Sequence, residues 1–267
     1  MTAEMPPAKP RHLAAEYAAQ FGDEEVAAAY RHRPPYPPET FVMLDSLLGS
    51  HPRTVLELGA GTGDFTLGLA PLADALVAVE PSRPMLERGV RRVPTVPGRV
   101  EWRPVSAEDL VFDRTYTAVV AAEALHWLDW HRVLPRIASS LAPTSHLFLV
   151  QRTLSPLPWD EDLRALVQTY STNRDYVPYD LVTELESRKL LVVSGQARTD
   201  VLVHSQSLDD YVESFHSRNG FSRARLPPGR AREFDDTLRA LVRRHGGNEV
   251  VRLPVQARIA WGRPVSE

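Results

Sequence analysis

The chain has 267 residues, of which 43% are hydrophobic, and a formal net charge of −3. This length and apolar content allow either one enlarged α/β domain or two small ones. The near balance of charge argues against a nucleic-acid partner, which usually requires a clear basic excess. The sequence contains no cysteine, which excludes disulfides, thiolate metal sites and a cysteine nucleophile.

The sequence also bears on location. Its first residues lack the continuous apolar core of a signal peptide. No apolar run in the chain approaches the roughly 18 residues that indicate a membrane span. We therefore expect a cytoplasmic protein without a membrane partner.

The predicted elements begin with an alanine-rich helix over 12–30, which the prolines of 33–39 end because proline removes a backbone donor. A helix over 39–48 follows. Strands are then predicted over 53–58, 75–80, 100–104, 115–122 and 146–152, with helices over 63–72, 82–92 and 130–141 between them. Strands and helices that alternate at these spacings predict a parallel sheet with right-handed crossovers.

After residue 152 the alternation changes. Helices are predicted over 160–171, 179–189, 207–216 and 230–245, and strands over 195–204 and 250–261. Gly246 and Gly247 would close the last helix. Helices between the fifth and sixth strands would be an insertion, and such an insertion is a natural place for a lid.

A glycine-rich turn follows the first predicted strand. The sequence E-L-G-A-G-T-G places Glu57 at the strand end and Gly59, Gly61 and Gly63 behind it. Glycines let the backbone turn sharply and approach a ligand, and the next helix offers unpaired N–H groups to a pyrophosphate or a carboxylate. The G-x-G-x-G spacing departs from the dinucleotide fingerprint G-x-G-x-x-G. A tight turn without a ligand remains the alternative.

An acidic residue ends the second predicted strand. Glu80 lies 21 residues after Gly59, close to the spacing of about 20 at which an acid meets a pair of ribose hydroxyls. A solvated strand end or a cap for the next helix is the alternative role for Glu80. A glycine turn and an acid at successive strand ends together favour a nucleoside site.

Four motifs follow one another over about residues 54–152: ELGAGTGDFT, VAVEPSRPML, SAEDL and AAEALHWLD. In this order they resemble the class I S-adenosylmethionine-dependent methyltransferases. The resemblance implies a Rossmann-like α/β fold with a seven-stranded, mostly parallel sheet, an antiparallel last strand, an N-terminal helical cover and a helical lid insertion. It implies one domain over 1–267, divided into the cover (1–40), the cofactor-binding core (41–152), the lid helices with the sixth strand (153–247) and the final strand (248–267).

The resemblance implies S-adenosylmethionine as the cofactor and indicates which residues line it. The glycine turn would face the methionine part, Glu80 the ribose, and the residues after Glu80 and near Glu108 the adenine. The less favoured alternative is that Glu108 or Asp109 only starts a turn. Arg33 in the cover would pair with the methionine carboxylate, unless it is solvated and its neighbouring tyrosines are core. The full expected set is Tyr30, Arg33, Glu57, Gly59, Ala60, Gly61, Gly63, Glu80, Pro81, Ser82, Met85, Ala107, Glu108 and Glu123.

The methyl acceptor would lie beside the segment that follows the fourth strand, because open α/β sheets bind ligands outside the carboxyl ends of their strands. This segment holds the candidate catalytic residues Glu123, His126 and Trp127. His126 would be a general base or would only position the loop. If Trp127 is not catalytic, it would form part of the pocket wall or of the core. A looser resemblance links the chain to the small-molecule branch that includes trans-aconitate methyltransferase-like bacterial enzymes. The expected acceptor pocket consists of Tyr36, His126, Trp127, His216 and Arg218.

The sequence shows no carboxylate and histidine cluster with convincing metal spacing, so no metal is expected. We expect O-, N- or C-methylation of a small molecule, such as a carboxylate or a biosynthetic intermediate, by a monomer or homodimer. One alternative is an enzyme of the same fold that binds S-adenosylmethionine but promotes a rearrangement. A less favoured alternative is an NAD-dependent oxidoreductase.

Overall fold

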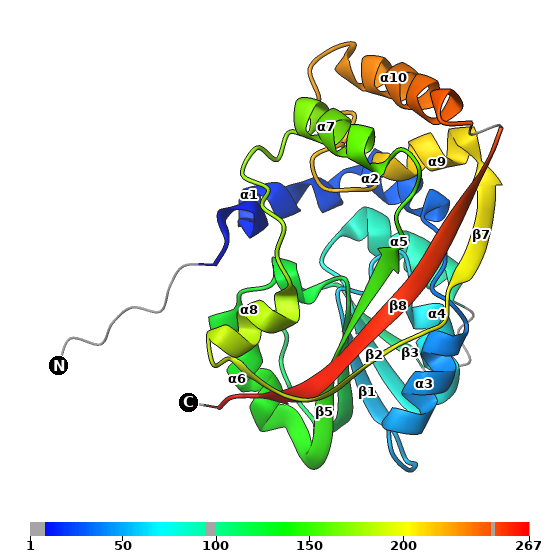
Figure 1. Ribbon diagram of the computed structural model, residues 1–267. Coiled ribbons are helices and arrows are strands. Elements are labelled where there is room, and N and C mark those ends of the chain that lie inside the picture. Colours follow the sequence, from blue (N-terminus) through cyan, green and yellow to red (C-terminus); the bar gives the residue numbers. More distant parts are fainter. Residues whose placement is uncertain (1–8, 94–99, 247–248, 267) are drawn as a thin grey trace.

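The computed structural model describes residues 9–93, 100–246 and 249–266. Its centre is one sheet in the strand order β3–β2–β1–β4–β5–β8–β6, with β7 also paired to β8 (Figure 1). Gly247 and the first eight residues of the predicted cover lie outside the described residues. The strands are β1 (Thr54–Leu58), β2 (Ala75–Val79), β3 (Val100–Arg103), β4 (Tyr116–Ala122), β5 (Leu141–Leu154), β6 (Leu191–Arg198), β7 (Leu202–Ser207) and β8 (Val250–Pro264).

The directions of the strands confirm the expected class of fold. Strands β1 to β5 pair in parallel, whereas β8 is antiparallel to β5 and to both β6 and β7. Parallel neighbours place their carboxyl ends along one edge, so the loops after β1, β2 and β4 lie together there. The sheet is thus mostly parallel with an antiparallel last strand, as expected.

The single strand predicted over 195–204 is wrong in one respect, because the structure divides this region into β6 and β7. The pairing with β8 shifts by one residue between them, from Arg198 opposite Arg258 to Leu202 opposite Val255. Thr199 occupies the break, where its N–H donates to the carbonyl of Ala257 and its hydroxyl accepts from the Ala257 N–H. Because of this bulge, the sheet of the described residues has eight strands, one more than expected, in an otherwise unchanged layout.

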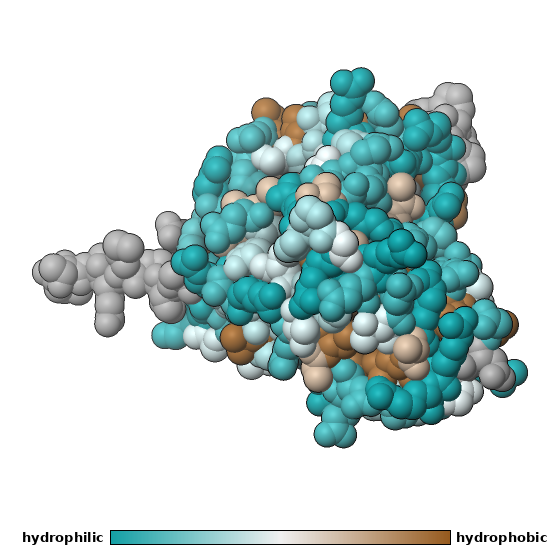
Figure 2. All heavy atoms as spheres, turned by 90° about the horizontal axis from the view of Figure 1, so that it is seen from above, coloured by the Kyte–Doolittle hydropathy of each residue, from teal (hydrophilic) through white to brown (hydrophobic). Residues whose placement is uncertain are grey.

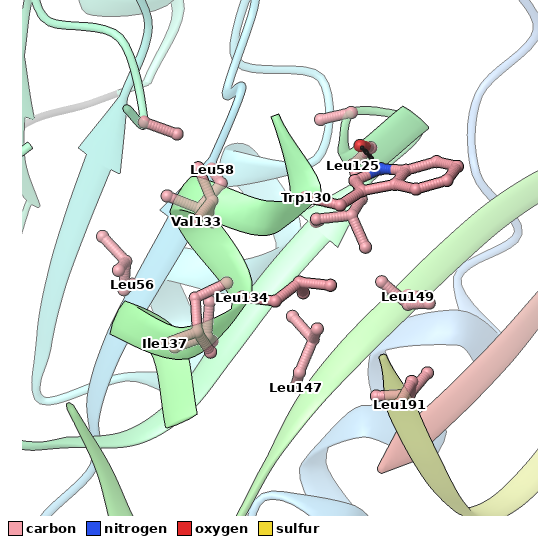
Figure 3. Packing of buried hydrophobic residues seen from close by; sticks show 14 of the residues in the cluster. Leu56, Leu58, Leu125, Trp130, Val133, Leu134, Ile137, Leu147, Leu149 and Leu191 are labelled. Atoms are coloured by element: carbon pink, nitrogen blue, oxygen red, sulfur yellow. Dashed lines mark hydrogen bonds between the residues drawn. The ribbon is translucent and has the colours of Figure 1, made fainter. Parts of the chain in front are cut away.

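Each face of the sheet buries its own hydrophobic cluster, because successive side chains of a strand point to opposite faces. Leu56 and Leu58 face α6 (Trp130–Ser140), whose Val133, Leu134 and Ile137 pack on them (Figure 3). On the other face, strand residues such as Val55 and Val120 pack against α3 (Glu39–Leu47) and α4 (Thr66–Leu69). A core on both faces holds the strand ends rigidly beneath the loops.

A third cluster forms the lid, which we define as α7 (Asp160–Tyr170), α9 (Leu208–Phe215), α10 (Arg230–Arg244) and the loop over 216–229. These helices gather at one end of the sheet in Figure 1. The fourth predicted helix of this region, α8 (Leu181–Ser187), packs instead on the sheet face beside α6. Seen from the lid end, the surface is mainly hydrophilic, with only small hydrophobic areas (Figure 2).

The continuous helix predicted over 12–30 is wrong. The structure breaks it into η1 (Arg11–Leu13), α1 (Ala15–Ala18), η2 (Ala19–Gly22), α2 (Glu24–Ala29) and η3 (Tyr30–His32). Ala14 and Asp23 are extended, and the Asp23 carboxylate binds Ser222 and Arg225 of the lid instead of capping α2. Tertiary contacts have therefore overridden the helix propensity of the alanines. We call residues 9–38 the cover.

The remaining helices agree closely with expectation. The structure has α3 and α6 at nearly the predicted bounds, together with α5 (Arg83–Arg92). The helix predicted from residue 63 begins later, at Thr66, because the glycine turn extends to Gly63, where φ is +78°. It ends in a 3₁₀ turn, η4 (Ala70–Leu72), and a second such turn, η5 (Leu125–Trp127), follows β4.

Candidate active site

The glycine turn after β1 brings three strand ends close together. Gly59 has φ +68°, and a Cβ at this position would lie 2.6 Å from the Cβ of Ala124, in the loop after β4. The N–H of Ala60 donates to the carbonyl of Val79 at the end of β2 (3.0 Å). Only glycine satisfies both the backbone angle and the close approach at position 59.

Glu80 holds the glycine turn in place. One carboxylate oxygen accepts the N–H of Gly61 (2.8 Å) and the other accepts the N–H of Ser82 (2.7 Å). Burial raises the pKa of Glu80, and the two N–H donors oppose this shift without cancelling it. Each oxygen keeps a lone pair for another donor. Glu80 therefore supports the backbone of the turn and remains able to accept a hydrogen bond from a ligand.

Ser82 joins the strand ends to the cover. Its side chain accepts the N–H of Met85, as the expected cap of α5, and its hydroxyl donates to the carbonyl of Phe21 (2.7 Å). The Phe21 ring then meets the Trp127 ring edge-on, with the ring centroids 5.2 Å apart. The cover is thus fixed across the loops that follow β2 and β4.

A cavity of about 440 Å³ lies between the strand ends and the cover. Most of the predicted cofactor residues line it, and Gly63 and Ala107 do not. Gly63 is packed against α5, where a Cβ would lie 3.2 Å from the Cα of Gly89, and Ala107 is buried in the sheet core. The predicted residues that line the cavity are Tyr30, Arg33, Tyr36, Glu57, Gly59, Ala60, Gly61, Glu80, Pro81, Ser82, Met85, Glu108, Glu123 and Trp127.

Polar atoms without partners mark the inner end of this cavity. Within the described part of the chain, Glu57 and Thr62 of the cavity lining have buried polar atoms that lack a well-formed hydrogen bond, and the Thr66 hydroxyl interacts with the Glu57 carboxylate. Burial raises the pKa of Glu57 to about 8. Buried polar groups normally have a partner, so this end of the cavity fits a ligand that donates hydrogen bonds.

Glu123 and Arg152 form an ion pair in the lining of the cavity. Glu123 accepts the N–H of Arg152 (2.9 Å) and lies 3.4 Å from its guanidinium and 3.6 Å from that of Arg33. Burial opposes ionisation of Glu123, but Arg152 and Arg33 outweigh it and lower the pKa of Glu123 below its usual value. Glu123 also has φ +51°, a left-handed conformation that costs about 1–2 kcal/mol for a residue with a side chain. The ion pairs help to hold it there.

Sequence reasoning missed Arg152. Its side chain is 8% exposed and lines the cavity. The guanidinium donates to the carbonyl of Pro34 and lies over the Tyr36 ring, 4.6 Å from the centroid. The available signal was an arginine at the end of the predicted fifth strand, HLFLVQR, on the ligand-binding edge of the sheet.

Arg33 connects the cover to the lid. Its Nε donates to the hydroxyl of Ser217 (2.7 Å), and Nη2 donates to the carbonyl of the same residue (2.5 Å). The guanidinium also lies over the Tyr30 ring, 4.0 Å from the centroid. The Arg33 side chain therefore points inward and joins the cover to the lid, and it is not a solvated surface arginine.

Three residues of the predicted acceptor pocket also lie outside the lining of the cavity. His126 packs beside Trp127 with the ring centroids 4.9 Å apart, and burial lowers the pKa of His126 to about 4. His216 is buried in the lid, where its ring nitrogens lie 2.8 Å from the carbonyl of Phe221 and 2.6 Å from the carboxylate of Asp235. Arg218 stacks on the Phe215 ring. The structure thus gives His216 a clear packing role.

Glu108 lies in the cavity lining and also binds the loop before α6. Its carboxylate accepts the N–H of Asp129 (2.7 Å) in that loop. Asp109 closes a local turn, because its N–H donates to the hydroxyl of Ser106 (3.1 Å). In residues 9–93, 100–246 and 249–266, no cluster of three His, Asp or Glu side chains could hold a metal ion, and no helix has the length and apolarity to cross a membrane.

Comparison with known proteins now identifies the domain. Residues 55–144 match a family model described as a methyltransferase domain, and this match contains the glycine turn, Glu80 and the loop of Glu123. Over these residues the chain is similar to the methyltransferase domains of the class I, S-adenosylmethionine-dependent type. S-adenosylmethionine is the cofactor of that family.

Curated relatives carry the same family name. An uncharacterised methyltransferase of Mycobacterium tuberculosis is 38% identical over 143 residues, which cover 53% of this chain and 56% of the relative. An uncharacterised methyltransferase-like protein of Schizosaccharomyces pombe is 30% identical over 150 residues, which cover 55% of this chain and 57% of the relative. The chain therefore spans little more than half the length of the curated methyltransferases that it matches.

Solved structures of other methyltransferases share the fold. A methyltransferase from Anaeromyxobacter dehalogenans aligns with a TM-score of 0.58 at 22% identity, covering 88% of this chain and 99% of that one. One from Thiobacillus denitrificans, crystallised with S-adenosyl-L-homocysteine, aligns with a TM-score of 0.54 at 18% identity, covering 90% and 97%. These likenesses confirm the Rossmann-like class I fold of the chain.

The close approach at Gly59 generates a stability prediction. Replacement by alanine adds a Cβ 2.6 Å from Ala124, in addition to the left-handed backbone angle. We expect Gly59→Ala to lower the free energy of unfolding by about 2–4 kcal/mol, as overpacking and backbone strain add. Gly229→Ala is the matched control, since Gly229 has φ +77° but nothing within 4 Å of the added Cβ. Urea denaturation followed by circular dichroism measures both. Equal losses for the two variants would contradict the proposed contact.

Proposed function

We propose that this protein transfers a methyl group from S-adenosylmethionine to a small-molecule acceptor. The observation that carries the proposal is the cavity of about 440 Å³ between the glycine turn, the other strand ends and the cover. Asp23 and Gln20 of the cover bind Arg225 and the Gly220 N–H of the lid, so the lid supports the cover from outside. A concave cavity of this size suits a small acceptor better than a macromolecule.

The residues that line the cavity suit the cofactor along its length. The glycine turn leaves room for the backbone to approach the methionine part, and the unpartnered oxygen of Glu57 is placed to accept from an ammonium group. Glu80 keeps free lone pairs for ribose hydroxyls, and Met85 provides an apolar contact for the adenine. Arg33 is the candidate partner for the methionine carboxylate. Gly63 and Ala107 would act by shaping the backbone, as they do not line the cavity.

When bound, S-adenosylmethionine would supply an electrophilic methyl group: a lone pair of the acceptor would attack the methyl carbon, the carbon–sulfur bond would break with its electrons going to sulfur, and S-adenosylhomocysteine would leave. The part of this chain is to align the two molecules and to exclude water. Tyr36, Glu123, Trp127 and Arg152 line the same cavity and are not needed for the cofactor contacts named above, so they are the candidates for the acceptor side.

His126 fits a positioning role better than that of a base. Its low pKa leaves the imidazole neutral at neutral pH but makes it a weak proton acceptor. Its ring does not line the cavity, whereas the ring of Trp127, on which it packs, does. We infer that His126 orients the Trp127 loop. Assignment of the protein as a monomer or homodimer of the cytoplasm stays a prediction.

Two measurements test the function. We expect calorimetric titration to show binding of S-adenosylmethionine in preference to NAD, and an assay with a panel of small acceptors to show release of S-adenosylhomocysteine. A preference for NAD would overturn the cofactor. Tight binding of S-adenosylmethionine with rearranged products and no S-adenosylhomocysteine would instead favour an enzyme that does not methylate.

Glu80→Gln tests the ribose contact. The amide of glutamine cannot accept hydrogen bonds on both sides, so we expect the affinity for S-adenosylmethionine to fall by about 10- to 100-fold, as expected for losing hydrogen bonds to a charged group. The loss of one backbone contact should also lower the melting temperature. Glu87→Gln, an exposed change on α5, is the control. Unchanged affinity in Glu80→Gln, measured by calorimetry, would remove Glu80 from the binding site.

Glu57 allows a prediction about protons. With a pKa of about 8, Glu57 is mostly protonated in the free protein at neutral pH, and an ammonium group beside it would favour the carboxylate. We expect binding of S-adenosylmethionine at pH 7 to release close to one proton, and the release to decline above pH 8. Titrations in buffers of different ionisation enthalpy measure this number. Glu57→Gln should abolish the release, and the same release from this variant would contradict the assignment.

A further inference from the structure

A second cavity adjoins the one between the strand ends and the cover. It has a volume of about 780 Å³ and lies between the end of the cover, α4 and β7. Arg33, Tyr36 and Asp64 line both cavities, so the two spaces meet at these side chains. Among the described residues, the rest of the second lining contains none of the expected cofactor residues. We call the first space the cofactor cavity and the second the side cavity.

The cofactor cavity alone offers little room for two ligands. Its volume of about 440 Å³ lies in the lower half of the range of about 300–1,000 Å³ that is typical of a cavity for one small molecule. Under the proposed function, on which this inference rests, it would already hold S-adenosylmethionine, a nucleoside with an amino-acid tail. An acceptor much larger than its reacting group would therefore have to extend beyond this cavity.

The junction of the two cavities lies beside the candidate acceptor residues. The Arg152 guanidinium lies over the Tyr36 ring, 4.6 Å from the centroid, and 3.4 Å from the carboxylate of Glu123. On its other contacts, the Tyr36 ring meets the Phe65 ring edge-on, with the centroids 5.0 Å apart. A group that extends from Arg152 past Tyr36 would therefore leave the cofactor cavity and enter the side cavity.

Each cavity opens to solvent at its own end of the cover. Ala15, Ala19 and Gly22, from α1 and η2, are exposed residues in the lining of the cofactor cavity. Leu67 and Ser205, from α4 and β7, are exposed residues in the lining of the side cavity. Figure 1 shows α1 and β7 on opposite sides of the molecule. An acceptor can thus reach the junction through the side cavity without passing the other opening.

Apolar side chains from three elements line the side cavity. They are Pro34 and Pro35 of the cover, Phe41 of α3 and Leu67 of α4. Gly68 allows the Phe41 ring to lie directly on α4, since a Cβ on Gly68 would lie 2.3 Å from that ring. Leu67 is 41% exposed. An apolar group bound here would remove Leu67 from water, which is favourable.

The charged side chains of the side cavity bind one another. Asp64 forms an ion pair with Arg92. Arg31, which is exposed to water, donates from Nε to Nε2 of His32 (2.9 Å), so the proton of His32 is on Nδ1. This nitrogen lies 2.7 Å from the carboxylate of Asp210. A charged ligand would lose hydration in this cavity without gaining a free partner of opposite charge among these pairs.

We propose that the side cavity binds the distal part of the methyl acceptor, and that this part is uncharged and largely apolar. The reacting atom would lie in the cofactor cavity beside Arg152, and the rest of the acceptor would pass Tyr36 toward β7. Phe41 and Leu67 would then determine specificity, and they make no contact with the cofactor. The acceptor class is a small molecule with an apolar ring or chain, and not a compact polar metabolite.

Analogues of the cofactor test this path while the acceptor is unidentified. In each analogue a nitrogen replaces the sulfur, and the nitrogen carries a methyl group, a phenylalkyl chain of about three to six carbons, or the same chain ending in a carboxylate instead of the phenyl ring. Calorimetric titration gives their affinities. We expect at least one phenylalkyl analogue to bind at least about 10-fold more tightly than the methyl analogue, as burial of a phenyl ring allows. The carboxylate analogue should show no such gain.

Two tryptophan variants locate the gain. Ser205→Trp should fill the side cavity and abolish the gain. Val203→Trp is the matched control and should retain it, because Val203 is exposed on the same face of β7 and lines neither cavity. Both variants should bind S-adenosylhomocysteine like the unchanged protein, which shows that they fold.

The possible results separate this proposal from the proposed function. The proposal is overturned if no phenyl chain gives a gain, if the carboxylate chain gives the same gain, or if the gain persists in Ser205→Trp or is lost equally in both variants. Failure of the unchanged protein to bind S-adenosylhomocysteine would instead overturn the proposed function.

Discussion

The carboxylate of Glu80 is the contact on which the rest of the site depends. It accepts backbone N–H groups from the glycine turn after β1 and from the start of α5 after β2, so it fixes two loops relative to each other. A buried carboxylate is costly unless donors surround it. The N–H groups of Gly61 and Ser82 that stabilise the buried carboxylate of Glu80 belong to the backbone that lines the cavity. The contacts that make the burial of Glu80 possible therefore also set the shape of the site.

Outward from this carboxylate, polar contacts attach the cover and the lid. Ser82 binds the carbonyl of Phe21 and so attaches the cover to the strand ends. The cover in turn binds the lid through Arg33 with Ser217 and through Asp23 with Arg225. Val26 and Ala27 of the cover also pack on Met85 of α5, whereas the named contacts of the cover with the lid are polar, and exposed ion pairs contribute little stability each. The cover and the lid are therefore joined to each other in a way that permits opening for ligand exchange.

The sequence predicted those features that depend on local pattern. Alternating apolar residues such as Leu56 and Leu58 define strands, glycine spacing defines the turn, and the motifs together indicate the family. What it did not predict depends on contacts across the fold. The cover lost its continuous helix because Asp23 binds residues about 200 positions away. His216 has the residue type of a catalytic group, but only the structure shows that Asp235 and Phe221 engage both of its nitrogens within the lid.

The charged side chains that line the cavity tie the parts of the site together. Glu80 binds the backbone of the glycine turn, whereas Glu123 after β4 pairs with Arg152 of β5 and with Arg33 of the cover. Arg33 in turn donates hydrogen bonds to Ser217 of the lid. The lining of the cavity and the attachment of the lid to the cover therefore depend on the same side chain, Arg33.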